Sequence, residues 1–274
     1  KIYFRAVGGY ALAVATQTIG QTQLRTYNDT GNTPVNAYTF KDVSASFGAG
    51  ANFNVAAGYM FSKFIGVDLN VQYLKSKKYE ISDKFIQTSS PGNSGRDEST
   101  TTVSSSAIFI NPSVIITPGA GSKVPYGRFG VIIGSPKLKS EESSYYDLDG
   151  KQETEREQEY KKGTAFGFQG AVGLNWMISN NLDIYAEVNF ISLTWYPAKS
   201  EITKYMVSRD DDPFEDVLPD ISVRDKKFEY KKEVEFQAQS DPDKPQQQLR
   251  QSVPFSSVAL QLGIKFTLGG HAAD

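Results

Sequence analysis

Residues 47–73 read FGAGANFNVAAGYMFSKFIGVDLNVQY, and this stretch decides the fold. Odd positions from Phe47 to Phe61 are apolar or aromatic, whereas the even positions between them are mostly Gly, Ala or Asn. After residues 62–64 the alternation resumes, and apolar residues from Ile65 to Tyr73 alternate with Gly, Asp, Asn and Gln. Successive side chains of a β-strand point to opposite faces. The stretch therefore predicts two antiparallel strands joined by a short turn, with one apolar face and one face of small or polar side chains.

Six further runs alternate in a similar way and bring the number of predicted strands to eight. They are residues 2–14, 106–117, 125–135, 166–176, 182–190 and 258–266. The second face of these runs carries mainly small or polar side chains rather than the Lys, Glu and Thr of a solvated sheet. A barrel of eight strands has room only for modest side chains in its lumen. The pattern thus favours an all-β, eight-stranded antiparallel barrel over a soluble β-sandwich.

The connections between these strands alternate strictly in length. Short ones lie near residues 62–64, 118–124 and 178–181, and long ones span about 16–45, 75–104, 136–163 and 197–253. Bacterial outer-membrane barrels have short periplasmic turns and longer extracellular loops. No apolar run reaches the roughly 18 residues of a transmembrane helix. We predict one transmembrane barrel domain over residues 1–268, with both termini periplasmic and the long loops extracellular, and a C-terminal tail at 269–274.

Aromatic side chains gather at the ends of the predicted strands, as in the girdles that flank the apolar band of membrane barrels. On the side of the short turns they are Tyr59, Phe61, Phe64, Trp176 and Phe266, and on the side of the long loops they are Tyr10, Tyr73, Trp195 and Tyr196. About nine residues of a tilted strand cross the hydrocarbon layer, which matches the run from Ile65 to Tyr73. These aromatic residues are predicted to mark the two membrane interfaces.

Two strand–turn–strand units carry a resemblance to a known family. They are GYMFSKFIGVDLNVQY (58–73) and GLNWMISNNLDIYAEVNF (173–190), each with an apolar strand end, a short Ser or Asn turn, small aliphatic residues and an inward acid. These units resemble the outer-membrane β-barrel family that includes the OmpA transmembrane domain and OmpX. The resemblance implies a barrel in the outer membrane of a Gram-negative bacterium. It covers the strands and none of the long loops.

Five charged residues fall at positions predicted to face the lumen. They are Arg5, Asp68, Arg128, Glu187 and Lys265. An isolated ion in a low-dielectric lumen is costly, so we expect these charges to pair with one another and form a polar plug. The side chains of Asn54, Asn111, Gln169 and Asn175 are candidates to complete the hydrogen bonding. The alternative is a charged constriction or gate that passes ions slowly.

The third and fourth long loops are predicted to contain β-structure that extends above the membrane. The third is predicted to be a hairpin that turns at Asp149-Gly150, with Glu153, Glu155, Glu157 and Glu159 on one face. A two-residue turn would place Glu157 opposite Glu142, which is repulsive, so either the register differs or cations lie nearby. Residues 147–150 lack most ligands of a calcium loop, and we expect no metal site. In the fourth loop, residues 226–237 alternate but carry too many Lys and Glu for lipid contact.

The composition argues against several classes of function. The chain has 274 residues, no Cys and one His, His271, beyond the last predicted strand. Without an internal His or any Cys, the usual Ser–His and Cys–His catalytic arrangements are not available. No Gly-rich phosphate loop opens a helix, and the net charge of -2 gives no electrostatic reason to bind nucleic acid. We expect neither an enzyme nor a cofactor.

Two functional hypotheses follow from these observations. The first is a plugged structural or interaction protein whose long loops engage outer-membrane lipid or lipopolysaccharide, another cell, or other outer-membrane proteins in a larger assembly. The second is a passive channel or transporter for small or hydrophobic molecules, resembling OmpW-like barrels. A transporter should have a ligand-sized space above the charges, lined by residues such as Ile191, Leu193 and Trp195. A filled tube would favour the first hypothesis.

Overall fold

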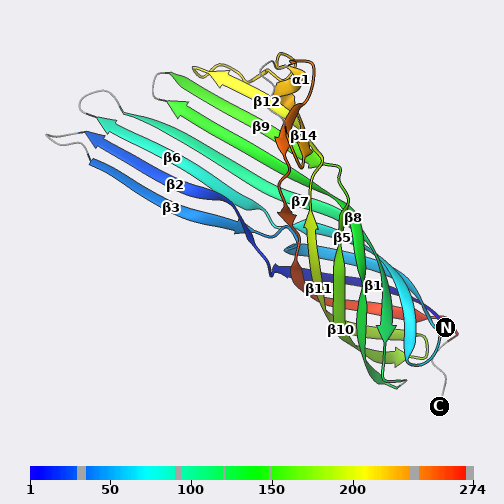
Figure 1. Ribbon diagram of the computed structural model, residues 1–274. Coiled ribbons are helices and arrows are strands. Elements are labelled where there is room, and N and C mark those ends of the chain that lie inside the picture. Colours follow the sequence, from blue (N-terminus) through cyan, green and yellow to red (C-terminus); the bar gives the residue numbers. More distant parts are fainter. Residues whose placement is uncertain (30–34, 90–93, 120, 148–149, 235–240, 270–274) are drawn as a thin grey trace.

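Eight long strands form the wall of a closed barrel in the computed structural model, which describes residues 1–29, 35–89, 94–119, 121–147, 150–234 and 241–269 (Figure 1). These strands are β1 (Ile2–Ala13), β4 (Gly50–Met60), β5 (Ile65–Ser76), β7 (Gly95–Ile116), β8 (Lys123–Asp147), β10 (Ala165–Ser179), β11 (Leu182–Trp195) and β17 (Ser257–Thr267). Each pairs antiparallel with the next, and β17 pairs with β1, from Tyr3 opposite Thr267 to Ala13 opposite Ser257. The predicted eight-stranded antiparallel barrel is confirmed.

The side chains of the wall alternate between two environments. Outward positions are apolar and exposed, as with Leu260 at 65 % and Leu262 at 67 %, whereas Gln261 between them is 0 % exposed and faces the lumen. A water-facing sheet does not carry such a continuous apolar surface. The outer face therefore matches hydrocarbon, where closure of the barrel also leaves no strand edge without hydrogen bonds.

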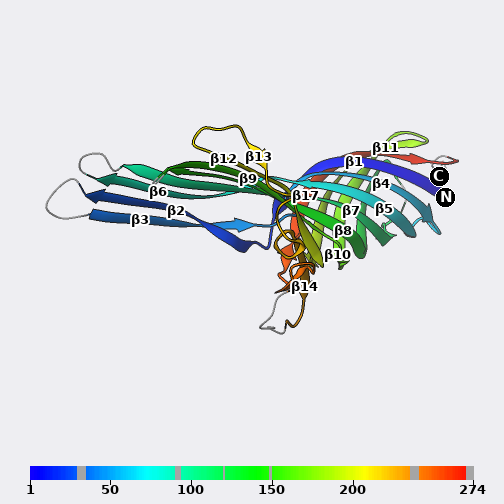
Figure 2. The same cartoon turned by 90° about the horizontal axis from the view of Figure 1, so that it is seen from above.

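A second sheet projects from one end of the barrel, and we call it the arm (Figures 1 and 2). It begins as the continuation of β7 and β8, which have 22 and 25 residues. The other strands of the arm are β2 (Gln17–Asp29), β3 (Val35–Ala45), β6 (Tyr79–Ser89), β9 (Lys151–Lys161) and β12 (Lys199–Arg209). The order across the arm is β3-β2-β6-β7-β8-β9-β12, with β2 and β6 parallel. Most of the predicted long loops are therefore β-hairpins continuous with the wall.

Short elements accompany the last strand of the arm. They are β13 (Glu215–Asp216), α1 (Val223–Lys226), β14 (Lys227–Lys231), β15 (Gln246–Leu249) and β16 (Val253–Pro254). Both β13 and β14 pair with β12, whereas β16 pairs with β11 of the barrel. Helix α1 begins at Ser222, whose hydroxyl accepts a hydrogen bond from the Asp225 amide at 3.2 Å. Among the described residues, no helix is long and apolar enough to cross a bilayer.

The barrel end opposite the arm holds the short turns, the N-terminus and the end of β17, and we call it the turn end (Figure 1). The turns there join β4 to β5, β7 to β8 and β10 to β11, as the alternating loop lengths predicted. In the first of them, the Ser62 hydroxyl accepts hydrogen bonds from the amides of Phe64 and Ile65. His271 and most of the predicted tail lie outside the described residues.

The strand that was predicted to begin at Phe47 does not begin there. Strand β4 begins at Gly50, and Phe47 is 2 % exposed instead of facing outward. The chain turns inward at residues 46–49. Gly48 lies very close to the Phe255 backbone there, since a Cβ added at this position would be 1.9 Å from the Phe255 carbonyl oxygen. The positive φ of 146° at Gly50 then returns the chain to the wall. This inward turn places an aromatic side chain inside the barrel.

Most of the predicted girdle residues lie on the outer face. Tyr10, Tyr59, Phe61, Phe64, Tyr73, Tyr196 and Phe266 are 40–64 % exposed, and Trp176 is half-buried. Trp195 is an error in that set, because it is 0 % exposed. Its position in β11 has the same parity as Glu187 and Asn189, so the alternation of the strand turns it inward.

The environment of the outer face can be tested at Leu262, near the middle of β17. We expect Leu262→Arg to lower the free energy of unfolding from a bilayer by about 2–4 kcal/mol, because the guanidinium would lie in hydrocarbon. Reversible urea unfolding in lipid vesicles measures this loss, and Leu262→Ala is the size control. An Arg variant as stable as the Ala variant would show that this face does not contact lipid.

Candidate functional site

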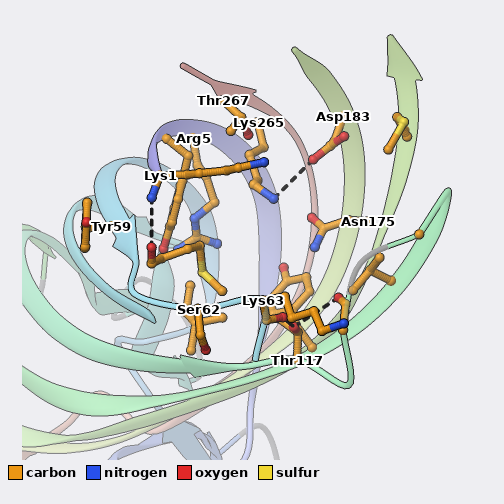
Figure 3. A pocket seen from close by; sticks show the side chains of 18 of the residues that line it. Lys1, Arg5, Tyr59, Ser62, Lys63, Thr117, Asn175, Asp183, Lys265 and Thr267 are labelled. Atoms are coloured by element: carbon orange, nitrogen blue, oxygen red, sulfur yellow. Dashed lines mark hydrogen bonds and ion pairs between the residues drawn. The ribbon is translucent and has the colours of Figure 1, made fainter. Parts of the chain in front are cut away.

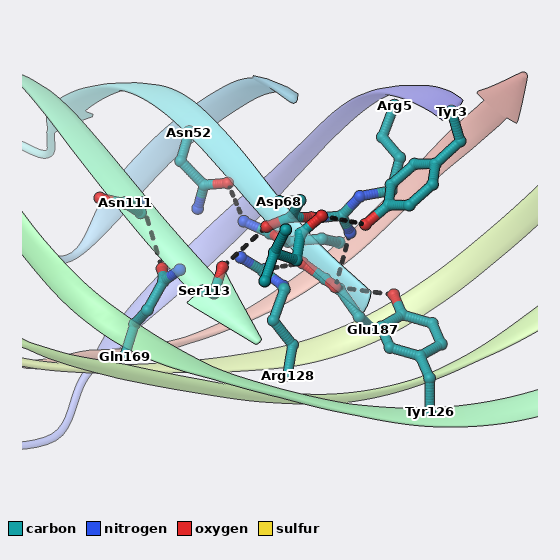
Figure 4. Close-up of polar contacts among 12 residues, drawn as sticks. Tyr3, Arg5, Asn52, Asp68, Asn111, Ser113, Tyr126, Arg128, Gln169 and Glu187 are labelled. Atoms are coloured by element: carbon teal, nitrogen blue, oxygen red, sulfur yellow. Dashed lines mark hydrogen bonds and ion pairs between the residues drawn. The ribbon is translucent and has the colours of Figure 1, made fainter. Parts of the chain in front are cut away.

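Four charged side chains from four strands meet inside the barrel near the turn end (Figure 4). Arg5 of β1 donates a hydrogen bond to Asp68 of β5, and its other terminal nitrogen lies 3.5 Å from a carboxylate oxygen of Glu187 of β11. Arg128 of β8 donates to the second oxygen of Glu187 at 2.8 Å. Each of these residues is at most 7 % exposed. Arg5, Asp68, Arg128 and Glu187 therefore form a paired, neutral cluster, which we call the ionic cluster.

Hydroxyl groups complete the bonding of the two carboxylates. Ser113 donates to Asp68 and Tyr126 donates to Glu187, each at 2.7 Å. Amide side chains were expected in this role from the sequence, and both hydroxyls were missed, although each lies at an inward position of its strand. Arg5, Arg128 and Glu187 pack so closely that no water-sized space remains among them.

Lys265 does not join the ionic cluster, contrary to expectation. In the sheet it lies between Arg5 and Asp183, and its ammonium pairs with the Asp183 carboxylate at 3.1 Å (Figure 3). Repulsion from Arg5 on one side and attraction to Asp183 on the other explain why Lys265 pairs with Asp183. The pair lies in a vestibule of about 610 Å³ at the turn end, which is also lined by Asn175, another of the predicted partners of the cluster.

A belt of amide side chains fills the middle of the lumen, on the arm side of the ionic cluster. All of its members are at most 4 % exposed, and they are Asn52, Asn54, Asn70, Gln72, Asn111, Gln169, Asn189 and Gln261. Asn111 donates to the side-chain oxygens of Gln72 and Gln169, at 3.2 and 3.1 Å, and Gln261 donates to Asn52. We call these residues the amide belt. It fills the tube with polar groups that carry no charge.

Aromatic side chains close the arm end of the lumen. Phe255 is central, with its ring centroid 6.1–6.3 Å from those of Phe47, Phe109 and Trp195, and Phe47 also contacts Tyr79 at 5.4 Å. The Trp195 indole donates to the Gly163 carbonyl at 2.9 Å, which satisfies its polar group. We call these five residues the apolar cap. Its residues come from five separate segments of the chain.

The residues expected to line a transport pocket belong to this packed region. Ile191 and Leu193 are 6 % and 2 % exposed and lie in the same buried cluster as Trp195 and Phe255. The structure brings the three β11 residues together, as the inward parity predicted. They pack against the apolar cap instead of lining a space for a ligand.

One face of the arm is a lattice of ion pairs. Lys139 of β8 lies 2.8 Å from Glu141 on its own strand and 2.8 Å from Glu157 on β9. Glu157 lies opposite Glu141. A two-residue turn would have placed it opposite Glu142, but Asp147 pairs with Lys151, which shifts the register by one residue. Asp149 lies outside the described residues. The repulsion predicted among the glutamates is relieved in both of the ways considered, namely by a shifted register and by nearby cations.

Two further glutamates of this face are paired in the same manner. Lys204 contacts Glu155 at 2.6 Å and Lys161 contacts Glu201 at 3.0 Å, both across the β9–β12 pair. The hydrogen bond from Lys139 lowers the pKa of Glu141, and that from Lys161 lowers the pKa of Glu201. The charged face therefore holds the arm strands in register.

Protonation should loosen the arm before the barrel. Because Glu141 and Glu201 have folded-state pKa values below their unfolded values, their stabilisation is present above the unfolded pKa of about 4.3. It is lost as the pH falls through the lower, folded pKa. We expect amide hydrogen exchange in β9 and β12 to accelerate below about pH 4, with no comparable change in β10 and β11. Uniform acceleration along the chain would contradict this account.

The unfolding free energies of single and double variants test whether Arg128 and Glu187 interact in the ionic cluster. Glu187→Leu leaves Arg128 without its partner, and we expect it to cost about 3–5 kcal/mol of unfolding free energy. Adding Arg128→Met removes the unpaired charge and should restore part of the loss. Urea unfolding in vesicles measures both variants. Strictly additive losses would mean that the two residues do not interact.

Comparisons with known proteins agree with this architecture. Residues 2–206 match the family model described as outer membrane protein beta-barrel domain. No curated protein sequence matches the chain. Among solved structures, the chain is similar to the outer membrane protein OprG from Pseudomonas aeruginosa, with 10 % identity, a TM-score of 0.38, and coverage of 96 % of this chain and 94 % of that one. Because the family model spans well over half of the sequence, this chain belongs to the outer membrane protein β-barrel domain family and is a bacterial outer-membrane barrel.

Proposed function

We propose that this protein is a closed barrel that anchors a rigid arm on the cell surface, where the arm binds another macromolecule. The arm end faces the exterior and the turn end faces the periplasm in this proposal. Short periplasmic turns and longer external segments are the usual arrangement of outer-membrane barrels. The termini at the turn end fit this orientation.

Three successive layers of side chains fill the lumen, and this filling is the main support for the proposal. The ionic cluster, the amide belt and the apolar cap succeed one another along the axis, and their side chains are buried. A lumen filled by these three layers, with open space only in the vestibule at the turn end among the described residues, supports an anchoring role more than a conducting one.

The arm offers a surface suited to recognition. Among the described residues, β3 pairs only with β2, so its outer edge keeps free backbone donors and acceptors. Val35, Tyr38 and Phe40 on this strand are 61 %, 59 % and 55 % exposed. The opposite margin of the arm differs, because β12 is covered by β13 and β14. An open edge with exposed aromatic side chains fits a partner that adds to the sheet or lies across it.

Passive transport is the second candidate, and two hollows favour it. One is the vestibule at the turn end. The other is a groove of about 700 Å³ on the outer wall around Pro112, Gly130 and Phe129. A solute that used either would still have to pass the amide belt or the apolar cap. Transport therefore requires a rearrangement that anchoring does not.

A shortened arm separates the two functions. Residues 23–40, 83–99 and 143–155 can each be replaced by Asn-Gly, because the residues that then flank the turns are already opposed in the sheet. We expect this variant to fold and to lose the surface partners that cross-link to the full chain, with solute uptake by cells unchanged. Variants with a single shortened hairpin serve as controls and locate the contact.

An unchanged set of cross-linked partners together with altered solute uptake would reject the proposed function and favour transport. Because the shortened hairpins lie beyond the barrel wall, heat-modified gel mobility and circular dichroism can confirm that the barrel itself is intact.

A further inference from the structure

We propose that Lys75, Ser106 and Lys137 bind a phosphate group of a membrane lipid on the outer wall, where the arm leaves the barrel. The inference goes beyond the proposed function, since it concerns the lipid around the barrel and not the partner of the arm. The inference depends on the position of the barrel wall in the bilayer. We call the three residues the phosphate clamp.

The register of the wall brings the three side chains together. Lys75 of β5 lies opposite Ser106 of β7, and Ser106 lies opposite Lys137 of β8. Directly opposed residues of neighbouring strands project from the same face, and adjacent strands are about 4.8 Å apart. The two lysines thus flank one hydroxyl on the outer face. On its other side Lys75 is opposite Ala51, so small residues surround its stem.

The phosphate clamp lies one row beyond exposed apolar side chains of the neighbouring wall. Nearer the turn end, Phe53 of β4, Tyr73 of β5 and Ile108 of β7 form a row of directly opposed, outward side chains, and Ser135 of β8 is opposite Ile108. The three apolar side chains are 59 %, 44 % and 59 % exposed. Two residues along a strand correspond to about 6.7 Å, so on β5 and β7 the clamp begins one row beyond these lipid-facing side chains. Lipid headgroup phosphates occupy this level of a bilayer.

Neither lysine of the clamp forms an ion pair within the described part of the chain, unlike several lysines of the arm above it. Among the described residues, no carboxylate oxygen lies within 4.0 Å of the ammonium group of Lys75 or Lys137, and both residues are exposed. Lys139, Lys161 and Lys204 farther along the same face each pair with a glutamate.

Two other charged groups face the clamp, and neither neutralises it. One is the acid Glu141, whose carboxylate lies 2.8 Å from Lys139 and whose pKa is lowered chiefly by that hydrogen bond, with a smaller electrostatic effect from Lys75 of the clamp. Lys78 also acts on Glu141 and adds a further positive charge to this region. The wall therefore presents net positive charge at the headgroup level and balanced charge beyond it.

The chemistry of these groups fits a phosphate. Two ammonium groups and one hydroxyl can donate to three phosphate oxygens, and lysine binds phosphate as a flexible point charge. The row below supplies apolar side chains for the acyl chains of the same lipid. A free anion would contact the clamp but not the apolar row below it, whereas a phosphorylated lipid would contact both.

The test uses the full chain in detergent micelles, titrated with bisphosphorylated lipid A and observed by native mass spectrometry. We expect the Lys75→Gln/Lys137→Gln variant to bind this lipid about tenfold more weakly than the unaltered chain, since each lysine near a membrane surface favours an anionic lipid. Lys41→Gln/Lys84→Gln, which removes two arm lysines far from the bilayer, should bind as the unaltered chain does. Lipid A without phosphates should bind weakly to all three proteins.

Three results would overturn the phosphate clamp. They are equal lipid binding by the Lys75→Gln/Lys137→Gln variant, equal weakening in the arm control, and inorganic phosphate alone competing as strongly as the lipid. The last result would assign the site to a free anion. None of these readouts involves the surface partners of the arm, so the clamp and the proposed function can fail independently.

Discussion

Backbone groups of a strand in hydrocarbon have no water to bond with, and the rest of this structure depends on that constraint. Each wall strand has to pair along both edges, and the β17–β1 pairing closes the ring. Closure of eight strands makes a narrow tube. The period of two then places every second residue in that tube, where an unpaired charged side chain is costly. The small and polar inward face of the sequence is a consequence of this geometry.

The lumen meets the constraint with three different chemistries along one axis. Arg5 and Arg128 are neutralised by Asp68 and Glu187, so the charges can be buried. The amide belt replaces charge with hydrogen bonds, as between Asn111 and Gln169. The apolar cap needs neither, except at the Trp195 indole and at the Tyr79 hydroxyl, which donates to the Ser46 carbonyl at 2.7 Å. The larger hydrophobic cluster therefore lies at the arm end, where it supports the base of the arm at the point where β7 and β8 leave the wall. A smaller cluster around Tyr3, Tyr126 and Tyr185 lies near the ionic cluster.

The sequence predicted what depends on local alternation and missed what depends on long-range contact. The strands, the short turns and the pairing of Arg5, Asp68, Arg128 and Glu187 follow from parity alone. The partner of Lys265 depended on the register across the β11–β17 pair, which a single strand does not reveal. Phe47 left the predicted face because Gly48 and Gly50 break the phase of the strand. The apolar cap joins residues more than 200 positions apart, such as Phe47 and Phe255, and no local pattern marks it.

The arm follows from the same hydrogen bonding, continued beyond the membrane with different side chains. Its strands keep register through ion pairs such as Lys204 with Glu155, where the wall relies on lipid and on a packed lumen. In the proposed function, this division of labour makes the barrel the anchor and the arm the exposed surface. Its central claim is that the lumen is closed. Single-channel recording of the full chain in planar bilayers tests that claim most directly: the account predicts the absence of large, steady open events, and their regular appearance would contradict it.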